Sequence, residues 1–313
     1  MDTDVSVLST PQNACSLTDL PTELLVQIIV LHRSSFDILS PVLEDIAQRQ
    51  VQHEVLHALS QSCSRLRAVC LPFLWERFDL SMVKFQTRLA DYKTALVPTI
   101  FSYIESVHVS MRGCRTQLQT MFNLVDFLRT LPNLAVLRIS WPNFRMIQDL
   151  CSAFSEACLP SVTSLYVPVL LHGIFPAFPN ITTLVCPAAI IAGSPVLARM
   201  KLFPRLTVLG ELRMVGSADL ISELARDFPQ LRTLSITTSI APDCENVFSL
   251  LNAFADLSEL CLFHEDSPDY LSLDVLVSRA KDVLLGSRSL DRRVLRIWSN
   301  SLSGPQLIYE ERF

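Results

Sequence analysis

The chain has 313 residues, half of them hydrophobic, and its 26 basic against 31 acidic side chains give a net charge of -5. This length accommodates one large domain or a small domain followed by a larger one. The acidic balance, without any Lys/Arg cluster interleaved with aromatic residues, argues against a nucleic-acid partner.

Neither export nor membrane insertion is expected. The N-terminal MDTDVSVLSTPQNACS is acidic where a secretory signal needs basic residues. No uninterrupted apolar run approaches the roughly 18 to 20 residues that span a bilayer. Nine cysteines without a CxxC pair suit buried thiols in a reducing compartment. We therefore expect a cytoplasmic or nuclear protein with no membrane partner.

The first predicted element follows a disordered stretch at 1–15 and is an amphipathic helix within LTDLPTELLVQIIVLH (17–32). Pro21 is well suited to the first turn of this helix, and Glu23 lies near the positive end of the helix dipole. The pattern predicts that Leu24, Leu25, Ile28 and Ile29 share one side.

A second helical run is predicted over 51–70, ending before Pro72, and it contains HEVLH (53–57). On a helix, His53 and His57 share a face and could hold zinc, with Glu54 activating a bound water, as in a metallopeptidase. A helical wheel instead predicts an exposed polar face, with Val55, Leu59, Cys63, Leu66 and Cys70 on the packing side. A solvated face is favoured, and zinc catalysis remains a remote alternative.

From about residue 100 a short phrase recurs. Its copies are LPNLAVLRI (131–139), LPSVTSLYV (159–167), FPNITTLVC (178–186), FPRLTVLGE (203–211), FPQLRTLSI (228–236) and FADLSELCL (254–262). The steps between Pro132, Pro160, Pro179, Pro204 and Pro229 are 28, 19, 25 and 25 residues. FSYIESVHV (101–109) and SLDRRVLRI (289–297) are interpreted as degenerate flanking copies.

Each phrase ends in the period-two alternation of a half-buried strand. Leu137 and Ile139 are predicted to face inward, and Val136, Arg138 and Ser140 outward. Stretches of helical period, such as TQLQTMFNLVDFLRT, separate the phrases. One strand and one helix per unit, stacked so that neighbours cover each other's apolar faces, predict a curved parallel solenoid.

This region, about two thirds of the chain, resembles the leucine-rich repeat family in its LxxLxI core and period. It departs from the family where Pro142, Leu170, Ala189, Ser239 and Glu265 replace an asparagine or cysteine. The expected fold class is α/β: a small helical module, then an irregular leucine-rich-repeat solenoid with parallel strands on the concave face and helices outside. On that face, the predicted substrate-binding residues are Arg138, Tyr166, Thr183, Ser235, Phe263, Arg296 and Trp298.

The N-terminal module resembles an F-box protein of the fungal type, in which the F-box precedes divergent repeats. The matching positions are Leu20, Pro21, Glu23, Leu24, Leu25, Ile28, Leu56, Leu59, Ser60, Cys63, Arg67, Leu71, Pro72, Leu74 and Trp75. The sequence departs from the family in SSFDILSPVLEDIAQRQ between the two matching stretches, and in Ser62 and Leu66.

The resemblance implies docking on the Skp-type adaptor of a cullin-RING (SCF) ubiquitin ligase, with the repeats presenting a protein substrate for ubiquitin-dependent degradation. Residues expected to dock the adaptor or to form the module's own core are Leu20, Pro21, Leu24, Leu25, Ile28, Leu59 and Trp75. The alternative is a repeat scaffold for protein binding that has lost its adaptor.

The expected organisation is an F-box-like module at 16–80 with an insertion around 34–50, and a linker or capping helix at 81–100. The repeats occupy 101–300 and a tail occupies 301–313.

The other candidate sites are explained more simply as structural or solvent-exposed features. Cys151 and Cys158 lie two turns apart on one predicted helix, which is typical of core packing. The acidic loop HEDSPDY (264–270) is expected to be solvated, with contact to a partner as the alternative. The chain has no GxxxxGK[ST], GxGxxG or GxSxG sequence. We therefore expect no enzymatic activity and no cofactor.

Overall fold

The computed structural model describes residues 20–31, 46–85, 98–114, 118–190, 194–213, 218–237, 244–264, 272–288, 292–301 and 304–313. The chain divides after Leu74 into two compact units. The first contains the N-terminal helices and the second contains a large sheet with its covering helices. The predicted N-terminal stretch at 1–15 and most of the predicted insertion lie outside the described residues.

The helical unit contains α1 (Thr22–Leu31), α2 (Ile46–Ser62) and most of α3 (Ser64–Trp75). The single helix predicted over 51–70 is therefore wrong in two respects. It is interrupted at Cys63, whose Sγ accepts a hydrogen bond from the backbone N–H of Leu66 at 3.4 Å. The second segment also continues through Pro72 instead of ending before it, although proline there removes one backbone donor.

The sheet unit contains one ten-stranded sheet whose strands follow the chain order. Its strands are β1 (Arg77–Ser81), β2 (Ser106–Ser110), β3 (Val136–Ser140), β4 (Ser164–Tyr166), β5 (Thr183–Ile190), β6 (Val208–Arg213), β7 (Thr233–Thr237), β8 (Glu259–His264), β9 (Val294–Ser301) and β10 (Gly304–Arg312). Strands β1 to β9 are parallel, and β10 returns antiparallel to β9.

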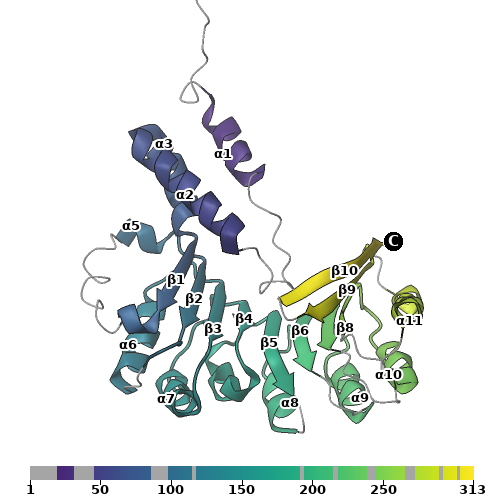
Figure 1. Ribbon diagram of the computed structural model, residues 1–313. Coiled ribbons are helices and arrows are strands. Elements are labelled where there is room, and N and C mark those ends of the chain that lie inside the picture. The colour runs from purple at the N-terminus through teal and green to yellow at the C-terminus, as the bar shows by residue number, and fades with distance from the viewer. Residues whose placement is uncertain are drawn as a thin grey trace, which may run out of the picture. The chain divides into compact units, whose positions relative to one another are not determined.

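Helical segments connect successive strands and lie along one side of the curved sheet (Figure 1). They are α5 (Pro98–Phe101), α6 (Leu118–Arg129), α7 (Phe144–Phe154), η2 (Val169–Ala177), α8 (Ser194–Met200), α9 (Ala218–Asp227), α10 (Cys244–Leu251) and α11 (Leu273–Gly286). Since parallel neighbours need a crossover connection, the strand and helix alternation in the sequence dictates this arrangement. The helix that the sequence predicts between the first two phrases is α6.

The repeated phrase explains the core between sheet and helices. The leading residue of all six phrases is buried: Leu131, Leu159, Phe178, Phe203, Phe228 and Phe254. Three residues later a second apolar side chain is buried, and on the strand Leu137 and Ile139 are 0% and 2% exposed, as predicted. Arg138, between them, is half-buried and points to the opposite side of the sheet. Each phrase therefore supplies one layer of a continuous core.

Polar side chains bridge consecutive phrases at the amino ends of the strands. Hydroxyl groups donate to the backbone carbonyl of the preceding phrase at 3.2 to 3.4 Å in Thr163, Thr182, Thr207 and Ser258. The amide of Asn180 donates to the carbonyl of Pro160 at 2.8 Å. The four carbonyls that accept these hydroxyl groups also accept backbone N–H groups, so the side-chain bonds add to the backbone bonds that align one unit on the next.

The ends of the sheet differ from the predicted boundaries. Strand β1 already pairs with β2, so the sheet begins at Arg77 and not after residue 100. Residues predicted as a C-terminal tail form β10, which pairs with β9 over most of its length. An antiparallel strand can be added through a short turn, so no further helix is needed to complete this edge.

The core makes a direct prediction for Phe203, which is fully buried with its ring 5.1 Å from that of Phe175. Phe203→Ala leaves a cavity that neighbouring phrases cannot fill, so we expect the free energy of unfolding to fall by about 3 to 5 kcal/mol. Urea denaturation measures this change. Leu202→Ala, at a 45% exposed neighbour, is the control and should change stability far less. Equal effects would contradict the packing described here.

Candidate binding surfaces

Helix α1 of the helical unit has two apolar faces. Leu25 and Ile29 are 3% and 8% exposed, whereas Leu24 and Ile28 are 44% and 39% exposed. Within each pair the residues are four positions apart and lie on one side of the helix. The sequence grouped all four together, but the structure separates a buried pair from a pair that is available to a partner.

Other predicted adaptor-binding residues take different places. Pro21 is exposed, and its carbonyl accepts the backbone N–H groups of Leu24 and Leu25, both at 3.1 Å. The carbonyl of Leu20 accepts a hydrogen bond from the Arg65 guanidinium at 2.6 Å, which ties the start of α1 to α3. Leu59 is half-buried.

Trp75 lies on the sheet side of the division after Leu74. It packs against the core of the sheet unit, with its ring 6.3 Å from that of Phe78. Trp75 therefore has a structural role in that core, and the structure gives it no place in the helical unit.

The histidine pair lies on α2 as predicted. His53 and His57 are exposed, and their rings stack with centroids 6.3 Å apart. No group of three or more His, Cys, Asp or Glu side chains that could hold a metal occurs within the described residues. The predicted packing face is wrong at Val55, which is 52% exposed. Together with Val51 it leaves apolar surface on α2.

The sheet unit presents a row of side chains on its outer face, which is the face opposite the helices. The strand register aligns these central-row residues in the order Asp79, His108, Arg138, Tyr166, Val185, Gly210, then Ser235, Cys261, Arg296 and Glu310. A register shift in β6 interrupts the row between Gly210 and Ser235. Charged groups concentrate at both ends of the row, and small or apolar residues occupy its middle.

The first end of the row is connected by His108. Its ring nitrogens lie 3.2 Å from a carboxylate oxygen of Asp79 and 2.9 Å from the hydroxyl oxygen of Ser140. Three successive strands are thus linked through one imidazole on the outer face.

The next charged group is Arg138, whose guanidinium carbon lies 4.8 Å from the centre of the Tyr166 ring. This distance is within the range of a cation–π interaction. Burial lowers the pKa of Arg138, an effect opposed by Tyr166, Glu211 and Asp79. Arg138 is therefore a largely desolvated cation whose charge is compensated from several strands.

Glu211 is the functional candidate that sequence reasoning missed. In the repeated phrase it occupies the position taken elsewhere by buried Ile139, Ile236 and Leu262. The strand accommodates it by a bulge: the register shifts between Leu209 and Leu212, and Glu211 adopts a φ of 56°. Positive φ is uncommon for a residue with a side chain, and a bulge redirects side chains next to functional sites.

The environment of Glu211 is unusual for a carboxylate. Burial raises its pKa from 4.5 to about 7, and the positive charge of Arg138 opposes that rise. The signal was available in the sequence, since FPRLTVLGE is the one phrase among the six that ends in a charged residue.

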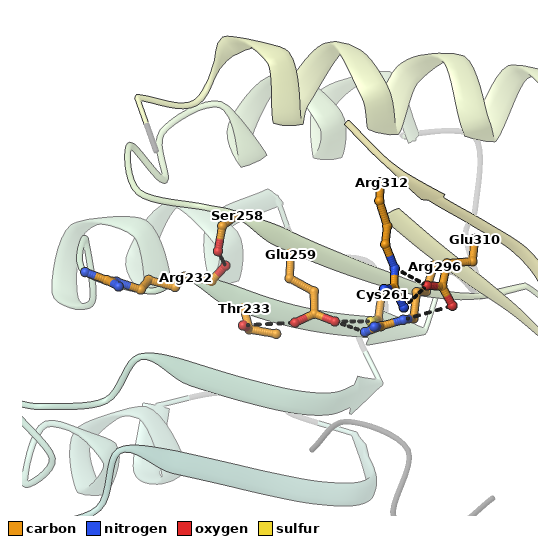
Figure 2. Close-up of polar contacts among 8 residues, drawn as sticks. All are labelled: Arg232, Thr233, Ser258, Glu259, Cys261, Arg296, Glu310 and Arg312. Atoms are coloured by element: carbon orange, nitrogen blue, oxygen red, sulfur yellow. Dashed lines mark hydrogen bonds and ion pairs between the residues drawn. The ribbon is translucent and has the colours of Figure 1, made fainter. Parts of the chain in front are cut away.

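The other end of the row contains an ion-pair network on β8, β9 and β10 (Figure 2). Arg296 pairs with Glu259, and its Nε lies 3.5 Å from Glu310, which also pairs with Arg312. The hydroxyl of Thr233 lies 3.5 Å from the second oxygen of Glu259. Only 12% of the Arg296 side chain is exposed, so this predicted substrate-binding residue is largely engaged within the sheet.

The remaining predicted substrate-binding residues are largely covered, and Tyr166 is only 7% exposed. Phe263 and Trp298 stack with ring centroids 6.4 Å apart and are 8% and 9% exposed. Thr183 and Ser235 are 5% and 0% exposed. Ser235 is therefore not presented on the surface. Whether the accessible members bind a substrate stays a prediction.

The comparisons with known proteins support the N-terminal part of this picture. Residues 4–96 match the family model of the F-box-like domain. No curated protein matches the chain. Among solved structures, the HpcH/HpaI aldolase from Desulfitobacterium hafniense DCB-2 shares 11% identity over 72% of this chain and 86% of its own, with a TM-score of 0.21. That likeness is too weak to support an argument about fold or activity.

The match covers α1, α2 and α3 and so includes both faces of α1. An F-box-like domain is consistent with an adaptor or substrate-recognition role in a ubiquitin ligase. Within the described residues, no helix has the length and apolar character needed to cross a bilayer.

Glu211 predicts a pH dependence of stability. Because its pKa is raised in the folded protein, the native state favours the protonated form, and stability should fall as pH rises from about 4.5 through about 7. Glu211→Gln removes this effect. As the pH is raised from about 5 to about 8, we expect the free energy of unfolding of the variant to increase by about 1 to 3 kcal/mol relative to that of the native sequence.

Urea denaturation at about pH 5 and pH 8 measures this change in stability, and Glu223→Gln, at an exposed position, is the control. A difference between variant and native protein that does not change with pH would contradict the proposed environment of Glu211.

Proposed function

We propose that this protein is the substrate-recognition subunit of an SCF-type ubiquitin ligase. The observation that supports this most directly is the exposed pair Leu24 and Ile28 on α1, within the stretch that matches the F-box-like domain. Large apolar side chains on a helix surface are what a partner protein can bury. The partner proposed here is the Skp-type adaptor of a cullin-RING ligase.

The sheet unit would capture the substrate. Its repeated phrases, sequential parallel strands and helices on one side are the features expected of an irregular leucine-rich-repeat solenoid, which is the finer assignment that we propose. The outer face offers the half-buried cation of Arg138, held against the buried ring of Tyr166, and the partly accessible imidazole of His108. Arginine is a common anchor of protein interfaces.

The proposed mechanism is proximity and not bond chemistry. Binding adaptor and substrate through separate units raises the effective concentration of the substrate near the ligase. We accordingly propose no catalytic residue and no cofactor. We interpret His53 and His57 as a surface pair on α2.

The adaptor interface gives a paired prediction. Leu24→Asp with Ile28→Asp places two charges where apolar side chains would be buried, so we expect adaptor affinity to fall about a hundredfold or more. Val30→Asp is the matched control, because Val30 is 48% exposed on the same helix but points elsewhere. It should retain binding. Affinity capture followed by calorimetric titration with the purified adaptor measures both.

Folding controls separate docking from stability. Leu25→Asp places a charge at a position that is 3% exposed and should lower the melting temperature, whereas the Leu24 and Ile28 changes should not. Absence of adaptor binding by the native chain would contradict the ligase assignment. The chain would then be interpreted as a repeat scaffold that binds proteins without an adaptor.

A further inference from the structure

Three large apolar side chains lie exposed at the carboxyl ends of neighbouring strands. Trp141 directly follows β3, Phe144 begins α7, and Leu170 follows β4; they are 73%, 75% and 57% exposed. Trp141 and Phe144 are the most exposed large apolar residues in the described part of the chain. Surface aromatic residues gathered in this way are typical of protein-binding sites.

The backbone holds these residues in fixed positions. The carbonyl of Ser140 accepts the backbone N–H of Met111 at 3.0 Å, which joins the turns after β2 and β3. The side chain of Asn143 accepts the backbone N–H of Met146 at 3.0 Å and so caps α7, which begins at Phe144. The apolar side chains therefore project from an ordered edge.

Trp141 is also held in a strained conformation. Its φ is 57°, a left-handed value that is costly for a bulky residue and natural for glycine. Nothing in its own packing explains why a tryptophan occupies this position, since most of the side chain is exposed. Strain of this kind concentrates at binding sites, where the side chain contributes something besides stability.

The charge around these side chains has one sign. Arg112 follows β2 and Arg145 follows Phe144; both are exposed, and neither is paired within the described residues. The described residues of the three turns, 111–114, 141–145 and 167–173, include no acidic side chain. The amino end of α7 adds a partial positive charge at the same edge. This is unusual in a chain with a net charge of -5.

We propose that this carboxyl-edge patch, formed by Arg112, Trp141, Phe144, Arg145 and Leu170, binds an acidic segment of a partner protein that carries a bulky apolar side chain. The apolar anchor would be buried against Trp141, Phe144 and Leu170, while flanking carboxylates would pair with the two arginines. The inference rests on the proposed function in taking the partner to be the ligase substrate. It names the chemical class of the segment that the sheet unit selects.

Selection of a random peptide library displayed on phage against the purified full-length chain tests this proposal. We expect enrichment of peptides in which several Asp or Glu residues flank an aromatic or Leu residue. In a polarisation assay with a fluorescein-labelled enriched peptide, Phe144→Ala and Trp141→Gly should each weaken binding at least about tenfold. Added salt should also weaken binding of the peptide to the native chain.

The substitutions are chosen so that binding and folding separate. Glycine suits the backbone at residue 141, so Trp141→Gly should leave the melting temperature unchanged or raise it. Arg112→Glu with Arg145→Glu should reduce affinity for acidic peptides and improve it for basic ones. The matched controls are Leu285→Ala, 59% exposed on α11, and Arg205→Glu, exposed in the turn before β6 at the opposite edge. Both should bind as the native chain does.

Several results would overturn the proposal: no enriched peptide, enrichment of neutral or basic peptides, or equal loss of binding in the controls. Binding of a short single-stranded oligonucleotide that is lost in the same variants would also overturn it, in favour of a nucleic-acid site. Adaptor affinity measured on the same proteins keeps the two proposals distinct. Intact adaptor binding with a failed peptide result contradicts only the carboxyl-edge patch, whereas failed adaptor binding contradicts the ligase assignment.

Discussion

The structure of the sheet unit depends on one constraint: a single strand and helix cannot cover its own apolar face, so each repeat must be buried by the next. Buried leading residues such as Phe178, Phe203 and Phe228 meet this requirement along the chain. Hydrogen bonds from Thr182 and Thr207 to preceding phrases hold the layers in register. Because side chains alternate along a strand, every second one points away from the core, and these side chains form the outer face of the sheet.

The exceptions to that alternation are the most informative positions. Glu211 stands where a core residue is expected, and the chain accommodates it with a bulge and a positive φ, while burial still raises its pKa. Trp141 directly follows its strand in a comparable conformation, but its side chain lies in solvent. Both residues depart from the local rule that governs the other repeats, which is expected of sites kept for function.

Much of the fold was accessible from sequence because its signals are local. The phrase period and alternation predicted the strands, and Leu137 and Ile139 face the core as expected. The division of α1 into a buried pair and an exposed pair was not accessible, because all four residues are apolar and only tertiary packing distinguishes them. The break at Cys63, the role of Trp75 and the strand β10 likewise depend on contacts between distant segments.

The candidate site was predicted less completely for a similar reason. Period two places Arg138 and Tyr166 on the outer face, but it does not reveal that Ser235 is fully covered or that Arg296 is engaged by two carboxylates. Accessibility is set by neighbouring strands, whose register is unknown from one sequence. The hydroxyl bonds between phrases could not be predicted either, because they depend on how neighbouring phrases align.

The central claim is that one unit docks an adaptor while the other remains free to bind a substrate. Hydrogen–deuterium exchange of the full chain, with and without the Skp-type adaptor, tests this claim most directly. The account predicts slower exchange in peptides covering α1, around Leu24 and Ile28, and unchanged exchange in strands β2 to β9. Unchanged exchange in α1, or protection confined to the sheet, would contradict it.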